Sequence, residues 1–315
     1  MIKIGVTGVI GSGKSTAVKY FSSLGVPVFI ADDYAKKLMN EDDFLKSEII
    51  KIIGDNAYKN NELNRKYISD VIFKDEKLLK SINNLIHPRV KKEYLNWLHK
   101  EYIPRRLEDP RILWASHYKS LGDVAHPGEK GRLSHDHLSI PAGDRFILIF
   151  GAVEPEVFTN PTVSEYHNSL SKDDKKFLSM KLKERYNVMT EEARGDGFEN
   201  RNDNSEGLSA CIQLGNFNAG SYEDEDELSS WYATWRIPSM KKLEGCIGVR
   251  KLVSVSGWAK HAILYEWQSA SARNKIFLDH ESHNQKMEAW TDRVVRKLVH
   301  APGSPNLAER IWPQS

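Results

Sequence analysis

The residues best suited to chemistry stand near the beginning of the chain, in the octapeptide Gly8–Ser15. This octapeptide fits the pattern G-x-x-x-x-G-K-[ST] of a phosphate-binding loop. Glycines let the backbone turn tightly, so that successive N–H groups point at phosphate oxygens. We expect Lys14 to reach the β- and γ-phosphates of ATP and the Ser15 hydroxyl to bind Mg²⁺. The predicted nucleotide-binding residues are Gly8, Gly11, Ser12, Gly13, Lys14, Ser15 and Thr16.

The sequence on both sides of this loop predicts the elements that would position it. Residues 2–6 form a short, mostly apolar run typical of a buried strand, and residues 16–23 contain no Gly or Pro, as a helix requires. A second buried strand is expected over 26–30. Asp32 follows that strand, at the edge where α/β sheets bind ligands. It is suited to take a proton from an attacking hydroxyl or orient Mg²⁺, and equally suited to cap a helix.

Composition narrows the class of protein. The chain has 315 residues, enough for two domains, and its formal net charge of +2 predicts no nucleic-acid or membrane partner. Two cysteines are too few for a disulfide framework. No apolar run reaches the length of a membrane span. These features predict a soluble cytoplasmic protein.

Residues 1 to about 95 resemble the N-terminal half of dephospho-coenzyme A kinase. The resemblance rests, in order, on residues 4–16, 24–32, 63–65, 71–75 and 85–88. The family transfers the γ-phosphate of ATP to the ribose 3′-hydroxyl of dephospho-CoA. The resemblance therefore implies a P-loop domain built on a parallel sheet, with ATP and Mg²⁺ as cofactors.

The same resemblance assigns roles to individual residues. It implies that Lys14 and Asp32 are catalytic, and that Arg65 and His87 lie where dephospho-CoA binds. Two departures from the family pattern are Val9, where a glycine is usual, and Ile30, where an aspartate is common. Nothing after about residue 100 matches the remaining strands or the lid of the family. The sequence thus predicts ATP binding but not catalysis, because phosphoryl transfer needs those parts.

An internal repeat marks the rest of the chain. The pattern W-x₅-I-P occurs at Trp97–Pro104 and again at Trp231–Pro238. Each copy is followed by two predicted strands, at 112–119 and 146–150 in the first copy and at 247–255 and 262–267 in the second. A helix, two strands and a helix form the later part of a β-α-β-β-α-β ferredoxin-like unit. The second copy also has a predicted opening strand at 210–217. The first copy has none, because residues 77–85, at the corresponding place, are predicted as helix.

Residues from about 92 to 315 resemble the dimeric α/β-barrel superfamily, in which two ferredoxin-like units pair their sheets. This resemblance implies a possible homodimer but names no reaction, because the fold serves many activities. We predict a partial α/β P-loop domain followed by α+β ferredoxin-like repeats. The expected parts are a P-loop domain (1–92), a first ferredoxin-like unit without its opening strand (93–190), a linker (191–208) and a second ferredoxin-like unit (209–315).

Two hypotheses of function follow. In the first, the N-terminal part binds Mg·ATP at Gly8–Ser15 and phosphorylates a hydroxyl, with Asp32 as base. The chain is then predicted to be a composite or fused protein, and the competing hypothesis is one divergent protein whose later segments replace the missing kinase strands. In the alternative, the chain is a non-kinase barrel protein of unknown ligand that carries a relic P-loop.

Other candidate sites are weaker. The residues His135-Asp136-His137 have metal-ligand character but lie in a Gly- and Pro-containing loop, and a solvated loop is favoured. His117 and His261 could face a barrel cavity, although a core or surface position is favoured.

Overall fold

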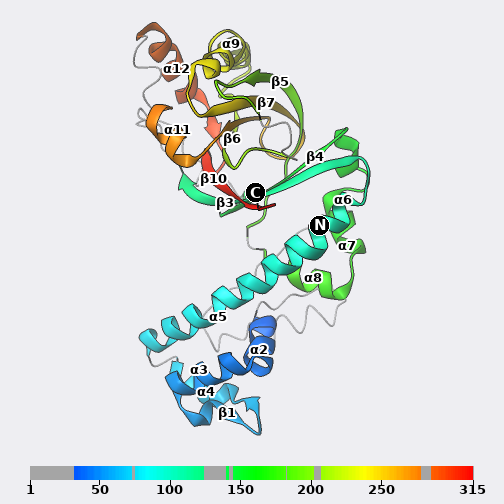
Figure 1. Cartoon of the computed structure of the whole chain (residues 1–315), viewed down its shortest axis with the longest axis vertical. Coiled ribbons are helices and arrows are strands. Elements are labelled where there is room, and N and C mark those ends of the chain that lie inside the picture. The colour runs from blue at the N-terminus through cyan, green and yellow to red at the C-terminus, as the bar shows by residue number, and fades with distance from the viewer. Residues whose placement is uncertain are drawn as a thin grey trace. The chain divides into compact units, whose positions relative to one another are not determined.

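The computed structural model describes residues 32–72, 75–123, 140–141, 145–181, 183–201, 207–277 and 285–314. The chain divides into two compact units (Figure 1). Unit 1 comprises Met1–Leu98 and Leu170–Lys181, and unit 2 comprises His99–Ser169 and Leu182–Ser315. The predicted strands at 2–6 and 26–30 and the helix at 16–23 lie outside the described residues.

The described part of unit 1 is a small helical body. Its elements are α2 (Asp32–Glu41), α3 (Asp43–Ile53), the 3₁₀ turn η1 (Asp55–Ala57), β1 (Tyr58–Lys59), β2 (Glu62–Leu63), α4 (Arg65–Ile72), α5 (Glu76–Trp97) and α8 (Lys172–Leu178). The buried core lies between these helices and consists of Ile49, Ile53, Ala57, Ile68, Ile82 and Ile86. Packing of this apolar cluster holds the short helices in place.

Local sequence explains where these helices begin and end. The Asp42 side chain accepts a hydrogen bond from Leu45 N–H at 3.0 Å and caps α3. Gly54, with φ of 102°, ends that helix in a conformation that favours glycine. At the end of α5, Trp97 stacks on Phe177 with ring centroids 5.0 Å apart. Its indole N–H also donates to Asp174 at 2.8 Å, which ties α8 to α5.

Unit 2 is built on one antiparallel sheet. Its strands are β3 (Ile112–Asp123), β4 (Phe146–Ala152), β5 (Val188–Asp196), β6 (Cys211–Asn218), β7 (Cys246–Ser256), β8 (His261–Trp267), β9 (Val299–His300) and β10 (Asn306–Trp312). The strand order is β4-β3-β10-β6-β8-β7-β5, and β9 pairs with β6. The sheet is strongly curled (Figure 1). All the strands predicted between residues 112 and 267 are thereby confirmed in position and type.

Short helices connect and cover these strands. They are the π-helical turn η2 (Leu98–Tyr102), α6 (Ile103–Leu107), η3 (Pro155–Phe158), α7 (Val163–Ser169), α9 (Glu223–Trp231), the π-helical turn η4 (Tyr232–Arg236), α10 (Ile237–Ser239), η5 (Met240–Lys242), α11 (Ala270–Ile276) and α12 (Gln285–Lys297). In the second copy, the first to fourth strands in chain order are β6, β7, β8 and β10. They lie in the sheet as β10-β6-β8-β7, so the spatial order is fourth, first, third, second. That is the order of a complete ferredoxin-like unit.

The two copies share an unusual local distortion. In each, five π-helical residues separate the tryptophan from the Ile-Pro pair, as η2 does before Pro104 and η4 before Pro238. Proline has no N–H to donate within a helix, and a widened turn accommodates its ring. The same distortion at the same place supports the internal repeat that the sequence indicated.

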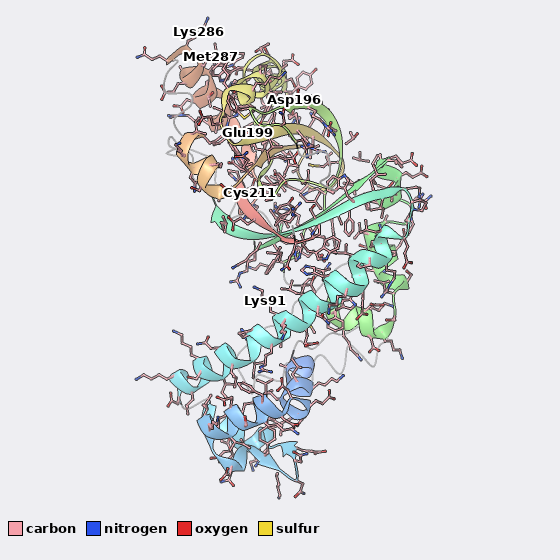
Figure 2. The ribbon with its side chains drawn as sticks, viewed as in Figure 1. Lys91, Asp196, Glu199, Cys211, Lys286 and Met287 are labelled. Carbon is pink, nitrogen blue, oxygen red and sulfur yellow. The ribbon has the colours of Figure 1, made fainter. Side chains whose placement is uncertain are left out.

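Two apolar clusters cover the two faces of the sheet. One contains Ile212 and Leu264, and the other contains Tyr265 and Trp267 together with Trp231 from α9. Because successive side chains of a strand point to opposite faces, β8 contributes to both clusters, and all seven of its residues are buried. Both cysteines are buried and free; Cys211 is labelled in Figure 2. Burial raises the pKa of both thiols to about 12.

The structure differs from the predicted linker over 191–208. Residues 191–196 form most of β5, which pairs with β7 along its length. The sequence did not indicate this strand, because Glu191, Glu192 and Arg194 are polar. On an edge strand the backbone makes the hydrogen bonds of the pairing, so the side chains can be polar. The two copies also lie together in unit 2, and the predicted boundary at residue 92 falls inside α5.

Replacement of Trp231 tests the packing of α9 on the sheet. Trp231 is 2% exposed and donates its indole N–H to Thr291 at 3.2 Å. Trp231→Ala should lower the free energy of unfolding of unit 2 by about 3–5 kcal/mol. Tyr222→Ala, at a side chain that is 88% exposed, should change it by less than about 0.5 kcal/mol. Urea unfolding followed by circular dichroism measures both, and equal effects would contradict this packing.

Candidate functional site

The predicted nucleotide-binding residues, Gly8–Thr16, lie outside the described residues. Asp32 is the first residue of α2, and a carboxylate at a helix start is favoured by the helix dipole. That position is compatible with each of the roles considered for Asp32. The roles of Lys14, Ser15 and Asp32 therefore stay predictions.

The two predicted acceptor-side residues lie on different helices of unit 1. Arg65 is the first residue of α4, directly after Asn64, whose side-chain oxygen accepts from Tyr67 N–H at 3.3 Å. His87 lies within α5, one residue before Pro88. Both side chains are exposed. They are therefore accessible to a ligand, and the buried Ile68 and Ile86 anchor their two helices to one core.

An ion pair near His87 was not anticipated from the sequence. Arg89 donates to the Asp42 carboxylate, and its guanidinium lies 4.5 Å from the ring centroid of Phe44. The hydrogen bond from Leu45 N–H and the Arg89 charge hold the pKa of Asp42 below its usual value, against the effect of burial. The Arg89 side chain stays one-third exposed. It is thus a pre-oriented positive group that can still offer donors to an anion.

A buried carboxylate organises the sheet interior of unit 2. Glu266 in β8 is fully buried and accepts from Arg201 Nη1 at 2.9 Å, Arg250 Nε at 3.0 Å and Ser209 N–H at 3.0 Å. Burial acts to raise the pKa of Glu266, but the Arg201 hydrogen bond and the Arg250 and Arg201 charges outweigh it, so the pKa is lowered. Since its oxygens are engaged by protein donors, Glu266 acts as a structural clamp.

His261 belongs to a second buried cluster. Its Nε2 lies 2.8 Å from Glu225 in α9, and its Nδ1 lies 2.9 Å from Lys251 Nζ, which also bonds Glu192 at 2.7 Å. Burial and the Lys251 charge lower the pKa of His261, and burial lowers that of Lys251. These contacts and the burial of its side chain make His261 a core residue, in agreement with the expected core or surface position.

His117 is likewise a core residue. It is 2% exposed, and its Nδ1 lies 2.8 Å from Nε2 of His99. Burial lowers the pKa of His99, which favours its neutral form. The His99 ring also lies over Trp312, with centroids 6.0 Å apart. The pair therefore ties η2 to β3 and to the end of β10.

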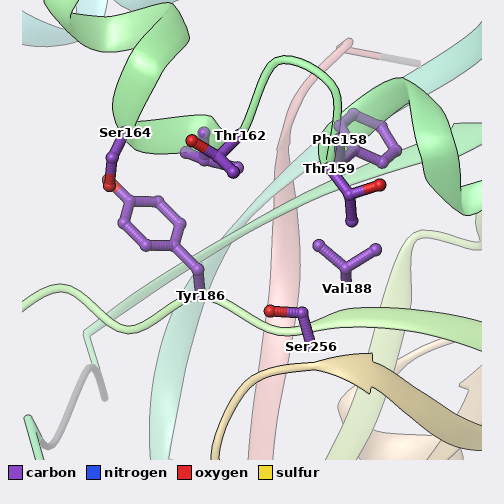
Figure 3. Close-up of a pocket in the computed structure, with 8 residues that line it drawn as sticks. Phe158, Thr159, Thr162, Ser164, Tyr186, Val188 and Ser256 are labelled. Carbon is purple, nitrogen blue, oxygen red and sulfur yellow. The ribbon is translucent and has the colours of Figure 1, made fainter.

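Unit 2 contains a small cavity rich in hydroxyl groups (Figure 3). Its volume is about 160 Å³, and its lining residues are Phe158, Thr159, Thr162, Val163, Ser164, Tyr186, Val188 and Ser256. The Tyr186 hydroxyl donates to Glu184 and lies 3.3 Å from His167 Nδ1, while Tyr102 Oη lies 2.8 Å from His167 Nε2. This hydrogen-bonded chain can hold a proton beside the cavity. The uncharged lining suits a small neutral ligand.

Across the described ranges, no group of three or more His, Cys, Asp or Glu side chains is placed to hold a metal ion. The residues His135-Asp136-His137 lie outside those ranges. None of the helices in the described ranges has the length and apolar character that crossing a membrane requires.

Comparison with known proteins bears on the N-terminal region. The family model described as dephospho-CoA kinase matches residues 2–121. Residues 2–121 are similar to dephospho-CoA kinases. The dephospho-CoA kinase of Porphyromonas gingivalis is 36% identical over 124 residues, which cover 39% of this chain and 61% of the relative. That of Bacteroides fragilis (strain YCH46) is 37% identical over 103 residues, which cover 32% of this chain and 50% of the relative.

The chain spans only about half to three-fifths of the length of these curated relatives. A solved structure described as a putative monooxygenase from Lactobacillus acidophilus NCFM aligns with 70% of this chain and 88% of its own. Its sequence identity is 13% and its TM-score is 0.39, too low to support an argument about fold or function.

The family match extends further than the resemblance seen in the sequence. It ends at residue 121, well beyond residue 95, and so includes most of β3. In the structure, β3 pairs antiparallel with β4 and β10 inside unit 2. The last part of the matched region therefore belongs to an antiparallel sheet, not to the parallel sheet that the kinase resemblance implied.

Neutralising Glu266 tests the buried clamp. Because folding lowers the pKa of Glu266, its carboxylate contributes stability above about pH 4.5 that is lost as the pH falls through the folded pKa. Glu266→Gln should cost about 3–5 kcal/mol at pH 7, since two arginines lose their counter-charge. It should also flatten the acid dependence of stability.

Glu309→Gln is the matched control, because Glu309 is an exposed strand residue of the same sheet. Urea unfolding at several pH values measures both variants. Equal stability of the Glu266 and Glu309 variants at pH 7 would show that the clamp contributes nothing.

Proposed function

We propose that the N-terminal region binds Mg·ATP through Gly8–Thr16 and takes dephospho-CoA on the helical body of unit 1. The observation that carries this proposal is the family match over residues 2–121, which contains the complete G-x-x-x-x-G-K-S loop. A phosphate loop followed at the expected spacings by the other matched segments is far more specific than the loop alone.

Each matched residue has a definite task in this proposal. Lys14 binds the β- and γ-phosphates, Ser15 holds Mg²⁺, and Asp32 acts as the base or orients the metal. Arg65 and His87 bind the acceptor. Support for the last assignment comes from their exposure on one helical body and from Arg89, a further cation two residues after His87. Three cationic or titratable groups suit a ligand that carries phosphates.

Complete phosphoryl transfer is not part of the proposal. The chain spans about half to three-fifths of its relatives, and the transfer step needs a closed lid and an assembled acceptor site. In addition, β3 lies in an antiparallel sheet, whereas the kinase resemblance implied a parallel one. We therefore propose a cytoplasmic nucleotide-binding protein in which ATP binds without efficient transfer to dephospho-CoA.

A second candidate function rests on unit 2. In this reading, the barrel-like unit forms a homodimer in the manner of the superfamily and binds a small neutral ligand in the cavity beside Tyr186. The phosphate loop is then a relic. The hydroxyl-rich lining favours it. The two candidates differ in one simple observation, because only the first requires saturable ATP binding.

Removal of the loop lysine tests nucleotide binding. Lys14→Ala should weaken Mg·ATP binding about 10- to 100-fold, since one charge-assisted contact to the phosphates is lost. Lys66→Ala, an exposed lysine of α4, should leave the affinity unchanged. Isothermal titration calorimetry on the full chain measures both. A folded wild-type chain that gives no binding would favour the relic hypothesis.

Removal of Arg65 tests the acceptor side separately. Arg65→Ala should weaken dephospho-CoA binding about tenfold, because a charged donor to phosphate is lost, and should leave Mg·ATP binding unchanged. Lys66→Ala again serves as the matched control, one residue away on the same helix. Binding by labelled dephospho-CoA would be followed at equilibrium. An unchanged affinity in the Arg65 variant would remove Arg65 from the site.

A further inference from the structure

Within the described residues, the sheet of unit 2 has one strand position that no strand fills. In the second copy, β6 lies between β8 and β10 and pairs antiparallel with both. In the first copy, β4 corresponds to β8, because it follows β3 as β8 follows β7. Strand β5 is the last strand of the first copy and corresponds to β10. Among the described residues, β4 pairs only with β3 and β5 only with β7. They form the two ends of the curled sheet (Figure 1).

The pairing between copies indicates that these two edges border one gap. The last strand of the second copy, β10, pairs with β3, and the last strand of the first copy, β5, pairs with β7. Each copy therefore adds its last strand to the second strand of the other. If the same exchange continues around the sheet, one position remains between β4 and β5. It is the place of the first copy's opening strand, which is not found among the described residues.

The side chains of β4 are consistent with a missing neighbour. Its sequence, Phe-Ile-Leu-Ile-Phe-Gly-Ala, is wholly apolar, yet none of its seven residues is buried. All seven residues of the matched strand β8 are buried. Two side chains of β4, Ile147 and Ile149, reach the interior cluster but are only partly covered there. An apolar strand at an uncovered sheet edge is a site for pairing with another strand.

The backbone of β4 offers donors and acceptors on its outer side. Ser120 N–H donates to Arg145 O at 3.0 Å, which fixes the alternation of the β3–β4 ladder. Counting by two from Arg145, the N–H and C=O groups of Ile147 and Ile149 face β3. Those of Leu148 and Phe150 face away from it. An added strand would pair with these outward groups.

We propose that the position between β4 and β5 binds one extended strand supplied by a separate polypeptide, antiparallel to both edges. Strand β6 indicates the chemistry of this partner, because it fills the equivalent position in the second copy. It has eight residues, its side chains are mostly buried on both faces, and it bears no charge. The partner is therefore an uncharged, largely apolar segment of about eight residues.

A peptide with the sequence of residues 209–220, with serine in place of its cysteine, is the direct probe. Fluorescence anisotropy of the labelled peptide, titrated with the full chain, should show saturable one-to-one binding. Leu148→Pro should weaken it at least tenfold, because proline removes an outward N–H while an edge strand tolerates proline there. Leu148→Ala, which keeps the N–H, should stay within about threefold.

Circular dichroism would verify that both variants are folded. The proposal is overturned if the folded wild-type chain does not bind the peptide. That result is expected if another part of the chain's own sequence fills the position. Equal binding by Leu148→Pro, or sedimentation as a dimer that excludes the peptide, would also overturn it. The test is independent of nucleotide, so failure of ATP binding and failure of strand binding are separate results.

Discussion

The structure of unit 2 depends on reciprocal strand pairing between two copies of one motif. Strand β10 of the second copy pairs with β3 of the first, and β5 of the first pairs with β7 of the second. Neither copy could cover its edges alone, because the backbone groups of an edge strand need partners. The exchange places both copies in one sheet. Among the described residues, it leaves one open strand position, beside the partly exposed apolar strand β4.

The sequence predicted these elements well where the pattern was local. The W-x₅-I-P repeat located equivalent helices, and apolar runs located β4, β7 and β8. It failed where strand identity depends on a neighbour: Glu191 and Arg194 in β5 look like linker residues, because the pairing with β7 is made by the backbone. Glu266 was missed as a charged centre, although a carboxylate in an apolar strand should have indicated buried partners.

The candidate site of unit 1 was predictable for a different reason. A phosphate loop depends on a few residues at fixed spacing, so Gly8–Ser15 can be recognised without knowledge of the surrounding fold. Arg89 was not recognised, because its pairing with Asp42 joins residues far apart in the chain. The family match then ends within β3, which belongs to the other unit. The proposed nucleotide-binding residues and the curled sheet therefore belong to different units of one chain.

The most direct test of the account is hydrogen exchange of the full chain with and without Mg·ATP, read by mass spectrometry on peptides from both units. The account predicts increased protection over residues 8–16 and at the start of α2, near Asp32, with unchanged exchange in β6, β7 and β8. Protection confined to the strands of unit 2, or no protection over residues 8–16 at saturating nucleotide, would contradict it.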